Sequence, residues 1–481
     1  MKYKHLFILL LTVSLQIVKA QDKKSDDLFV VKPYLQIGRE PSAESLELLW
    51  HVTDVNADWS VEQRNGNSGA WTKASTPAYN KVAVAGVAPH RVYHSKLTEL
   101  ISGGTFNYRV LMNGSVLFSS EGKSPKNDQQ SYRFVAFGDI GAETPDQKLL
   151  AIRAFKAKPD LVVIPGDIVY ENGTVKEYRS KFWNVYNADQ ENAQGAPIMR
   201  SVPFVAATGN HDSDNRDLDK FPDGLAYYMF WDQPLNGPVG VEGNAWIPAL
   251  KASDVNRKAF LEAAGDSYPR MTNYSFNYGN AHWTVVDSNP YVDWTDKEIT
   301  NWVKNDLASP AAKNATWRFV IFHHPGFSSS REHYEQQHMR LLSPIFEAGN
   351  VDVVFNGHVH NYQRSFPLTF TPDKQGTLMV GGKDLKTVRG RVVPGRWKLD
   401  KAFDGKTITK PKGIIYLVTG AGGQDLYNPE QNDDQDSWQK FTDKFISNVH
   451  SLTVADVNGK TLIIKQISAE GKELDAFTVT K

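Results

Sequence analysis

Five short apolar runs between residues 134 and 360 are each followed directly by side chains that can bind a metal ion. The polar residues after these runs are Asp139, Asp167, Asn210-His211-Asp212, His323-His324 and His358-Val359-His360. Carboxylates, amides and imidazoles are common ligands of metal ions in proteins. Because sites in α/β sheets form at the carboxyl ends of the strands, we expect these side chains to converge on one metal centre. Bound metal ions activate water and stabilise negative charge, which is the chemistry of hydrolysis.

A purely structural role explains any one of these pieces but not the whole set. A single Gly-Asp pair is usually a turn, and a single histidine usually has an ordinary hydrogen-bond partner. Burying Asp139, Asp167, His323, His358 and His360 side by side without a cation would leave charges and polar groups unpaired. The glycine that precedes most of these ligands lets the backbone turn sharply after the strand. The set therefore favours a metal site.

An α/β domain is expected over residues 132–481, because apolar runs of strand length alternate there with helical patterns. One helix is predicted at 299–307, where the apolar residues share one face. Thr295 and Glu298 have the spacing of a capping box at its start.

Residues 28–120 show a different pattern, in which every second residue is apolar over 46–52 and 106–112. Alternation of this kind buries one face of a β-strand against a second sheet. Turn-rich stretches separate the runs, so we expect a small sandwich of the immunoglobulin or fibronectin type III kind. The polar stretch 121–131 is the expected linker to the larger domain.

The bulk composition limits the class of protein. A chain of 481 residues is too long for one ordinary core, so two domains are expected. Lys+Arg and Asp+Glu are both 54, and this balance argues against a nucleic-acid-binding protein. The chain has no cysteine, so its stability must come from apolar burial, bound metal or both.

Residues 1–20 have the pattern of an export signal. Lys2 and Lys4 precede a short apolar stretch, and small residues at Val18 and Ala20 mark a cleavage site. A membrane anchor is the alternative, but the apolar stretch is short for a span, and no later segment is long and apolar enough. We therefore expect a protein without a membrane span that is exported to the periplasm or secreted.

Taken together, the ligand-bearing segments resemble the metallophosphoesterases, and among them the purple acid phosphatases. The pattern of that family is Asp, Gly-Asp-x-x-Tyr, Gly-Asn-His-Asp/Glu, Val-x-x-His and Gly-His-x-His. This sequence supplies Asp139, Gly166-Asp167-Ile168-Val169-Tyr170, Gly209-Asn210-His211-Asp212, Val320-Ile321-Phe322-His323 and Gly357-His358-Val359-His360. The resemblance also covers the N-terminal module and residues 413–423. It implies a four-layer α-β-β-α sandwich, preceded by the small all-β sandwich.

The same resemblance implies a binuclear centre with Fe(III) and a divalent ion, which is Zn, Mn or Fe. The implied ligands are Asp139, Tyr170 and His360 for the ferric ion, Asn210, His323 and His358 for the divalent ion, and Asp167 for both. Carboxylates and a phenolate suit a trivalent ion, whereas imidazoles and an amide suit a borderline divalent ion. A tyrosinate bound to iron would colour the protein. The alternative for Tyr170 is an ordinary core tyrosine.

The function that follows is hydrolysis of a small phosphate ester, of the acid phosphatase type, by attack of a metal-bound hydroxide. The ions keep a net positive charge after their ligands are counted, and this charge attracts phosphate. Two alternatives stay open: a Mn or Zn phosphodiesterase or nucleotidase, and a non-catalytic surface binding protein.

Two histidines are candidates for direct catalytic roles. His211 follows Asn210 and should face the substrate, where it would steady the phosphoryl oxygens. His333 stands where the family places a substrate-side histidine, and we expect it to be the general acid. Position 332 carries Glu where some relatives carry His, and an exposed histidine at a helix start is the alternative for His333. Asp212 either orients the His211 ring or caps a turn.

Two segments are candidates for shaping specificity. The aromatic stretch 221–274 either lines the cleft or packs as a small subdomain, and packing is the preferred interpretation. Segment 374–412 carries 11 Lys and Arg against three acids. It either attracts polyanionic substrates or is a solvated loop, and the solvated loop is preferred.

Overall fold

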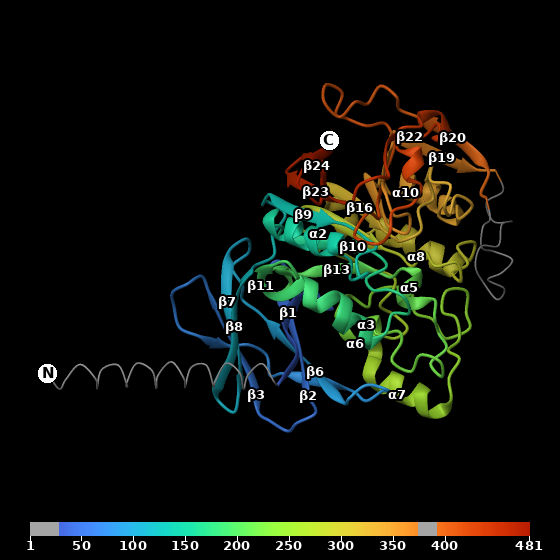
Figure 1. Ribbon diagram of the computed structural model, residues 1–481. Helices are drawn as coiled ribbons and strands as arrows, with labels where there is room; N and C mark the ends of the chain where they lie inside the picture. Colours follow the sequence, from blue (N-terminus) through green and yellow to red (C-terminus); the bar gives the residue numbers. More distant parts are fainter. Residues whose placement is uncertain (1–27, 374–391) are drawn as a thin grey trace, which may run out of the picture.

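The computed structural model describes residues 28–373 and 392–481. The predicted export signal at 1–20 lies outside these residues, as does the part of segment 374–412 that precedes residue 392. Within the described ranges, no helix is both long and apolar enough to cross a lipid bilayer. Figure 1 shows the N-terminal strands as a lobe beside a larger body that holds the remaining strands and most helices.

The larger of the two main sheets has ten strands in the order β25-β24-β23-β9-β10-β13-β1-β2-β6-β5. In that order the strands span Glu473–Thr480, Thr461–Ser468, Ser451–Asn458, Tyr132–Ala136, Leu161–Pro165, Phe204–Ala207, Phe29–Gln36, Leu46–Thr53, His90–Leu97 and Ala78–Val82. Strands β9, β10 and β13 are parallel to one another, so their carboxyl ends lie at the same edge of the sheet. These are three of the five strands that the sequence predicted to carry ligands.

The second main sheet has seven strands in the order β14-β15-β16-β17-β21-β18-β22. They span Tyr274–Tyr278, Ala281–Val285, Trp317–Ile321, Val353–Asn356, Ile415–Thr419, Tyr362–Ser365 and Thr442–Ile446. Strands β15, β16, β17 and β21 are parallel. The other two predicted ligand-bearing strands, β16 and β17, are neighbours at the centre of this sheet.

The two main sheets pack face to face through a buried aromatic and aliphatic core. Phe134 of β9 meets Trp283 of β15 at 5.0 Å and Phe355 of β17 at 5.6 Å between ring centroids, both edge to face. All three side chains are fully buried. Aromatic pairs in this geometry add to the apolar burial that holds the sheets together.

Helices cover the outer faces of both sheets. Helix α2 (Pro145–Lys156) packs Leu150 and Ala151 against the first sheet, and helices α8 (Lys297–Leu307) and α10 (Ser343–Ala348) pack Ile299 and Phe346 against the second. The larger body is therefore the four-layer α-β-β-α sandwich that was predicted. Four-layer packing requires strands with two buried faces, which explains the continuous apolar runs in the sequence.

The start of helix α8 differs from the predicted capping box. The N-cap is Asp296, whose carboxylate accepts the N–H groups of Glu298 at 2.8 Å and Ile299 at 3.4 Å. Thr295 instead donates its hydroxyl to Asp293 at 2.6 Å. The prediction for Thr295 is wrong because Asp, one residue later, is an equally good N-cap.

The N-terminal lobe is a small β-sandwich, as predicted. Strands β4 (Thr72–Lys73), β3 (Trp59–Asn65), β7 (Thr105–Met112) and β8 (Ser115–Lys123) form a four-stranded sheet that packs against β1, β2 and β6. The two sheets share a core that includes Trp50, Phe106 and Tyr108. Strand β1 also pairs with β13 through Gln36 and Phe204, so the lobe's sheet continues into the larger body. The division at residues 120 and 131 stays a prediction.

The remaining elements are short. They are the helical segments Val175–Glu177, Tyr178–Trp183, Asn184–Tyr186, Ile198–Arg200, Asn210–Ser213 (α5), Tyr227–Phe230 (α6), Asp254–Ala264 (α7), Gly265–Ser267, Pro310–Asn314, His338–Leu342, Pro429–Gln431 and Gln435–Ser437, and the strands Asn187–Asn192, Gly195–Pro197, Leu368–Pro372 (β19) and Gly395–Leu399 (β20).

Tyr227, Phe230 and Trp231, in the aromatic stretch 221–274, are buried in the core beside the first sheet. The packing interpretation of that stretch is the one the structure supports.

Buried histidines lie where the N-terminal lobe meets the larger body. The hydroxyl of Tyr34 lies 3.0 Å from Nε2 of His51 and donates to the carbonyl of Phe230 at 2.9 Å. His90 is 1% exposed and lies 3.2 Å from the guanidinium of Arg179. Burial, and then the charge of Arg179, lower the pKa of His90 to about 4.

We expect this interface to lose stability in mild acid. Because the pKa of His90 in the folded state lies below its value of about 6.5 in an unfolded chain, His90 adds no penalty above that pH. Between about pH 6.5 and 4 the unfolded state takes up the proton first, which lowers the free energy of unfolding by up to about 3 kcal/mol. Replacing His90 with Gln should flatten this fall in denaturant titrations between pH 7 and 4. A parallel fall in both proteins would contradict the prediction.

Candidate metal centre

The seven predicted metal ligands lie on loops at the carboxyl ends of strands from both main sheets. Asp139 follows β9, Asp167 and Tyr170 follow β10, and Asn210 follows β13 in the first sheet. In the second sheet, His323 follows β16, and His358 and His360 follow β17. Hydrogen bonds between the sheets fix this meeting point, since Gly138 N–H donates to the carbonyl of Thr419 at 2.9 Å.

Asp139, Tyr170 and His360 form one compact group of potential ligand atoms. The Tyr170 hydroxyl lies 3.0 Å from Oδ1 of Asp139 and 3.2 Å from Nε2 of His360, and that nitrogen lies 3.4 Å from the same Asp139 oxygen. All three side chains are at most 4% exposed. Three such atoms within 3.4 Å of one another can contact a single ion.

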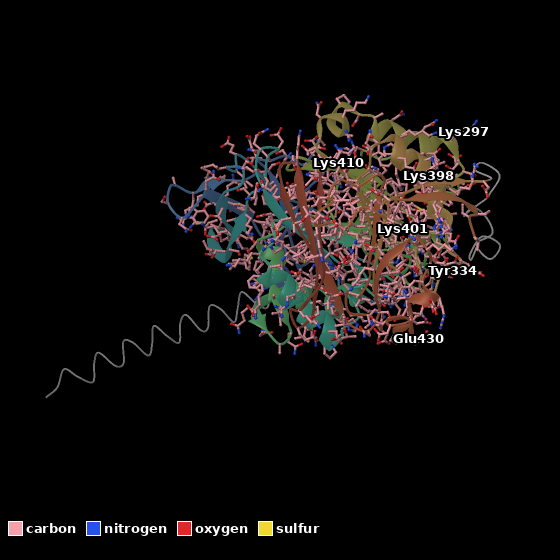
Figure 2. All side chains as sticks on the ribbon, turned by 90° about the horizontal axis from the view of Figure 1, so that it is seen from above. Lys297, Tyr334, Lys398, Lys401, Lys410 and Glu430 are labelled. Atoms are coloured by element: carbon pink, nitrogen blue, oxygen red, sulfur yellow. The ribbon has the colours of Figure 1, made fainter. Side chains whose placement is uncertain are left out.

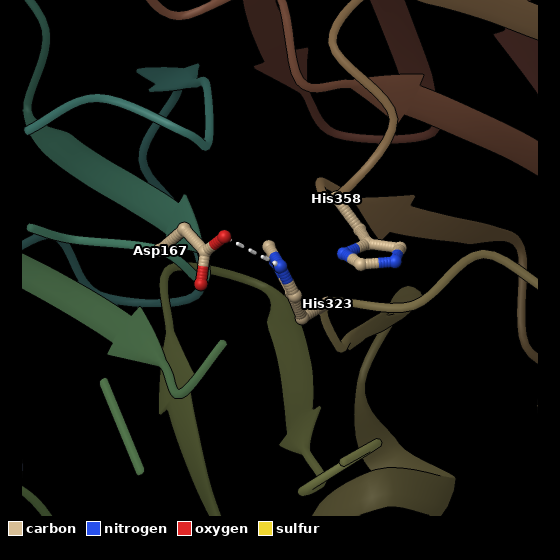
Figure 3. Close-up of side chains that lie close together, drawn as sticks. All are labelled: Asp167, His323 and His358. Carbon is tan, nitrogen blue, oxygen red and sulfur yellow. Dashed lines mark ion pairs between the residues drawn. The ribbon is translucent and has the colours of Figure 1, made fainter. Parts of the chain in front are cut away.

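Asp167, His323 and His358 form a second group, shown in Figure 3, in which the ligand atoms lie within 4.8 Å of one another. Oδ2 of Asp167 is 3.1 Å from Nε2 of His323. Oδ1 of Asn210, which is also buried, has no hydrogen-bond partner among the described residues. A buried amide oxygen without a partner is costly unless a cation uses it.

Each of the three imidazoles commits one ring nitrogen to a fixed acceptor and leaves the other for the cluster. Nδ1 of His323 donates to the carbonyl of Pro165 at 2.9 Å, and Nδ1 of His360 donates to the carbonyl of Asp425 at 2.7 Å. Nε2 of His358 donates to Oε1 of Gln336 at 2.7 Å. Hydrogen bonds of this kind fix the tautomer and the orientation of histidines that bind metal ions.

The backbone adopts unusual conformations at the ligands themselves. Asp139, Asp167 and His358 have φ angles of 60°, 50° and 67°, in the left-handed region that Asp and His tolerate better than most residues. Gly209, which precedes Asn210, is needed for close approach of two loops rather than for the predicted sharp turn. A Cβ at this position would lie 2.0 Å from Oδ1 of Asp167. Gly166, which precedes Asp167, has a φ angle of 92°, in keeping with the predicted sharp turn, and a Cβ on it would also lie 2.4 Å from Nδ1 of His323. These glycines allow ligand loops to approach one another closely.

The buried charges of the cluster act strongly on one another. Burial alone would lower the pKa of His323, but the carboxylate of Asp167 raises it to about 9. Burial, Asp139 and Asp167 raise the pKa of the Tyr170 phenol well above its usual value. Tyr170 can therefore ionise at neutral pH only when a strong positive charge lies beside it.

His211 and Asp212 have distinct roles next to Asn210. The ring of His211 lies over Tyr170 at 4.3 Å between centroids, its Nδ1 donates to the carbonyl of Glu171 at 2.8 Å, and its side chain is 27% exposed. Its other nitrogen is thus available on the open side of the site. Asp212 makes no hydrogen bond to His211, and its carboxylate accepts the N–H groups of Gly209 at 2.8 Å and Ile168 at 3.1 Å. Of the two roles considered for Asp212, the structure supports the capping one.

His333 packs over the metal centre rather than projecting into solvent. Its ring lies 4.2 Å from that of His358 between centroids, and the amide nitrogen of Gln336 donates to its Nδ1 at 3.2 Å. Burial lowers the pKa of His333 despite the opposing charge of Glu332. With Nδ1 accepting from Gln336, the proton of the neutral ring is on Nε2, where it is available to a substrate.

Sequence reasoning missed two side chains at the centre. Gln336 contacts both His358 and His333, and Tyr427 stacks on the His360 ring at 4.0 Å with an interplanar angle of 12°. Neither residue belongs to a motif, and both lie on segments without regular periodicity. The glycines at 420–423 are the available signal for the Tyr427 segment, since a Cβ on Gly422 would lie 1.9 Å from the carbonyl of Gly138.

Buried polar residues after β15 support the ligand loops from behind. The hydroxyl oxygen of Ser288 accepts the N–H groups of His323 at 3.0 Å and His324 at 2.8 Å. The amide of Asn289 donates to the carbonyl of Gly209 at 3.2 Å. The loop after β15 therefore joins the ligand loops of both sheets.

The arrangement of four layers with metal-ligand atoms between the strand ends defines a metallophosphoesterase fold. A family model described as "Calcineurin-like phosphoesterase" matches residues 132–362. The chain is 24% identical to "Probable inactive purple acid phosphatase 1" of Arabidopsis thaliana, with 94% of this chain and 69% of that protein covered. It is 26% identical to "Probable inactive purple acid phosphatase 27" and 24% identical to "Purple acid phosphatase 18" of the same plant, over 88% and 48% of this chain. It spans 64% and 44% of the lengths of those two relatives.

The overall structure is also similar to that of a solved protein. Purple acid phosphatase PPD1 from yellow lupin (Lupinus luteus) seeds superposes with a TM-score of 0.60 at 18% identity, over 93% of this chain and 74% of that one. Residues 132–362 thus match the calcineurin-like phosphoesterase family model, and the chain is similar in sequence to purple acid phosphatases over most of its length.

The residues present fit a binuclear metal centre of the kind that this family uses. Two carboxylates, a phenol, three imidazoles and an amide offer hard oxygen and borderline nitrogen atoms, the donor set expected for first-row metal ions. Oδ1 of Asn210, which is buried and has no hydrogen-bond partner in the part of the chain that the structure describes, lies in the group assigned to the divalent ion.

We expect Asp212 to be needed for metal binding although it lies outside the predicted ligand set. Replacing Asp212 with Ala removes the acceptor that joins the Asp167 loop to the Asn210 helix start, so the two ligands lose their relative position. Supporting groups of this kind typically change metal affinity about 10- to 100-fold. Calorimetric titration of metal-free protein with Zn²⁺ measures the affinity of each variant for this ion. Asp217→Asn, which removes a surface carboxylate paired with Lys251, is the matched control and should bind like the original protein.

Proposed function

We propose that this protein hydrolyses phosphate monoesters at a binuclear metal centre of the purple acid phosphatase type. The observation that carries the proposal is the convergence of all seven predicted ligand side chains on the loops where the two sheets meet, with three imidazoles oriented toward the cluster. The family match and the named relatives support the same reaction class.

Bound metal ions would supply an activated water and positive charge for the developing transition state. His211 borders the open side of the site, where its free ring nitrogen hydrogen-bonds a phosphoryl oxygen. His333 gives its Nε2 proton to the departing alkoxide, so that the product leaves as a neutral alcohol. Gln336 holds the His333 ring in the tautomer that this step requires.

The proposed metal pair is Fe(III) in the group of Asp139, Tyr170 and His360, and a divalent Zn, Mn or Fe ion in the group of Asn210, His323 and His358. Asp167 lies next to His323 and is the proposed bridge. The burial of Tyr170 beside two carboxylates supports a trivalent ion, because a weaker cation would not overcome the raised pKa of this phenol. Export to the periplasm or beyond is also proposed, from the sequence of residues 1–20 alone.

A non-catalytic binding protein is the second candidate, and the names of two relatives favour it because they include the words "probable inactive". Against it, this chain keeps the complete ligand set and a histidine at position 333. A third candidate is an esterase that holds Mn or Zn ions in both metal positions. In that case Tyr170 would stay a neutral phenol. Colour and turnover separate these candidates.

We expect protein purified from its own host to contain two metal ions per chain and to absorb visible light. Replacing Tyr170 with Phe should abolish the visible band, because the band requires a tyrosinate bound to Fe(III). Replacing Asp167 with Asn should lower the metal content and reduce turnover of p-nitrophenyl phosphate by at least about 100-fold. Metal analysis, absorption spectra and chelator treatment measure these effects. Coloured Tyr170→Phe protein would show that another group causes the band.

Gln336 allows metal binding and acid catalysis to be separated. Gln336→Glu keeps an acceptor for His358 but cannot donate to Nδ1 of His333, so we expect normal metal content and a kcat at least about 10-fold lower. Gln336→Ala loses both contacts, and metal affinity should fall about 10- to 100-fold as well. Calorimetry and steady-state kinetics on p-nitrophenyl phosphate give the two readouts. Equal metal loss in both variants would contradict the proposed division of roles.

A further inference from the structure

Two segments far apart in sequence form one wall over the metal centre. We define the acidic wall as residues 330–336 and 425–431. Oδ1 of Asn428 accepts the hydroxyl of Ser330 at 2.5 Å and the N–H of Glu332 at 2.9 Å. Gln431 accepts the N–H of Arg331 at 2.9 Å. Figure 2, which labels Tyr334 and Glu430, shows both segments at the same edge of the molecule.

The inner side of the acidic wall covers one histidine from each ligand group. The Tyr427 ring stacks on His360, and the His333 ring lies over His358. Tyr427 and His333 face each other edge to face at 5.4 Å between centroids. A phosphate held between the two ligand groups therefore has this wall beside it, and the proposed general acid His333 places the leaving alcohol on the wall's side.

The charge of the wall is strongly one-sided. Its two segments contain the acids Glu332, Glu335, Asp425 and Glu430 but a single base, Arg331. Arg331 is already paired with Glu430 at 3.2 Å and with Asp434 at 3.9 Å. Glu332 and Asp425 are exposed and have no ion pair within residues 28–373 and 392–481.

The unpaired charges act on the rings that cover the metal centre. Burial, Asp139 and then Glu332 raise the pKa of Tyr427, and Asp425 acts in the same direction. Glu332 also opposes the effect of burial on the pKa of His333. Glu332 adjoins His333 in the chain, and the carbonyl of Asp425 accepts a hydrogen bond from Nδ1 of His360 at 2.7 Å, so both carboxylates belong to residues that border the two ligand groups.

We infer that the acidic wall selects phosphate monoesters whose leaving alcohol is uncharged or cationic, and that it disfavours those whose leaving group is anionic. This substrate class rests on the proposed phosphomonoesterase function. The metal centre attracts the phosphoryl group of every such ester equally, so the charge next to His333 decides between leaving groups. Nucleotide polyphosphates and phosphorylated carboxylic acids are then poor substrates, and phosphorylated amino alcohols are good ones.

Binding of two matched analogues tests the charge preference without turnover. 2-Aminoethylphosphonate and 3-phosphonopropionate have the same phosphonate and the same two-carbon chain, and they differ in the charge at its end. Calorimetry on metal-loaded protein at low salt should show tighter binding of the amine. We define the selectivity ratio as the dissociation constant of 3-phosphonopropionate divided by that of 2-aminoethylphosphonate. This ratio should be about 3-fold lower in the single variant Glu332→Gln, and about 3-fold lower in the single variant Asp425→Asn, than in the original protein. It should also fall as salt rises, because these carboxylates are exposed to solvent.

The control variant is Asp433→Asn, which removes an exposed carboxylate two residues beyond the wall that lines a separate surface cavity with Trp438 and Lys444. This variant should keep the original ratio. Equal binding of the two phosphonates, tighter binding of the carboxylate, or the same change in Asp433→Asn as in Glu332→Gln would each overturn the inference.

Hydrolysis of three alkyl esters separates this inference from the proposed function. Phosphocholine, glycerol 1-phosphate and 3-phosphoglycerate should follow that order in kcat/KM, and Glu332→Gln should narrow the spread about 3-fold. Turnover of all three esters at equal rates would contradict the proposed charge preference and support the proposed phosphatase function. Selective binding of the amine without turnover of any ester would contradict the phosphatase function and support the selectivity of the acidic wall.

Discussion

Two carboxylates, a phenol and three imidazoles buried at one point are the constraint on which the rest of this structure depends. Asp139 and Asp167 are at most 1% exposed, and no arginine or lysine ion pair to either is present within the described residues. Buried charges of one sign are tolerated only with a compensating cation. The sheets, glycines and supporting hydrogen bonds of this domain all serve to hold these groups in contact.

The backbone at the centre shows what that contact requires. Three ligand positions have left-handed φ angles, a conformation that costs about 1–3 kcal/mol each outside glycine, and less for Asp and His. Cross-linking hydrogen bonds offset this cost: the Asp139 carboxylate accepts the N–H of His358 at 2.9 Å, and Ile140 donates to the carbonyl of Asp167 at 3.0 Å. Each ligand loop is thus held in its strained form by its neighbour, and the site forms as a unit.

The sequence was sufficient to predict the strands and the polar side chains that follow them, because both are local features. An apolar run and the polar residue after it are adjacent in the chain, and parallel strands bring their ends together without further information. The roles of Asp212, Gln336 and Tyr427 were not predictable in the same way. Each depends on contact with a segment distant in sequence, and a glutamine or tyrosine on an irregular segment gives no periodic pattern. The pairing of β1 with β13, which joins the N-terminal lobe to the larger body, was hidden for the same reason.

Under the proposed function, the metal centre and the acidic wall divide the recognition of a substrate between two electrostatic fields of opposite sign. A cationic centre that binds phosphate tightly cannot by itself distinguish one ester from another, because every ester presents the same group. Discrimination must come from the side on which the alcohol leaves, where His333, Tyr427 and Glu332 lie on segments joined by Asn428. Glu332 places an exposed carboxylate next to the proposed general acid in the chain. In this proposal the carboxylate of Glu332 favours an uncharged or cationic leaving alcohol, while His333 still donates its proton to the leaving group.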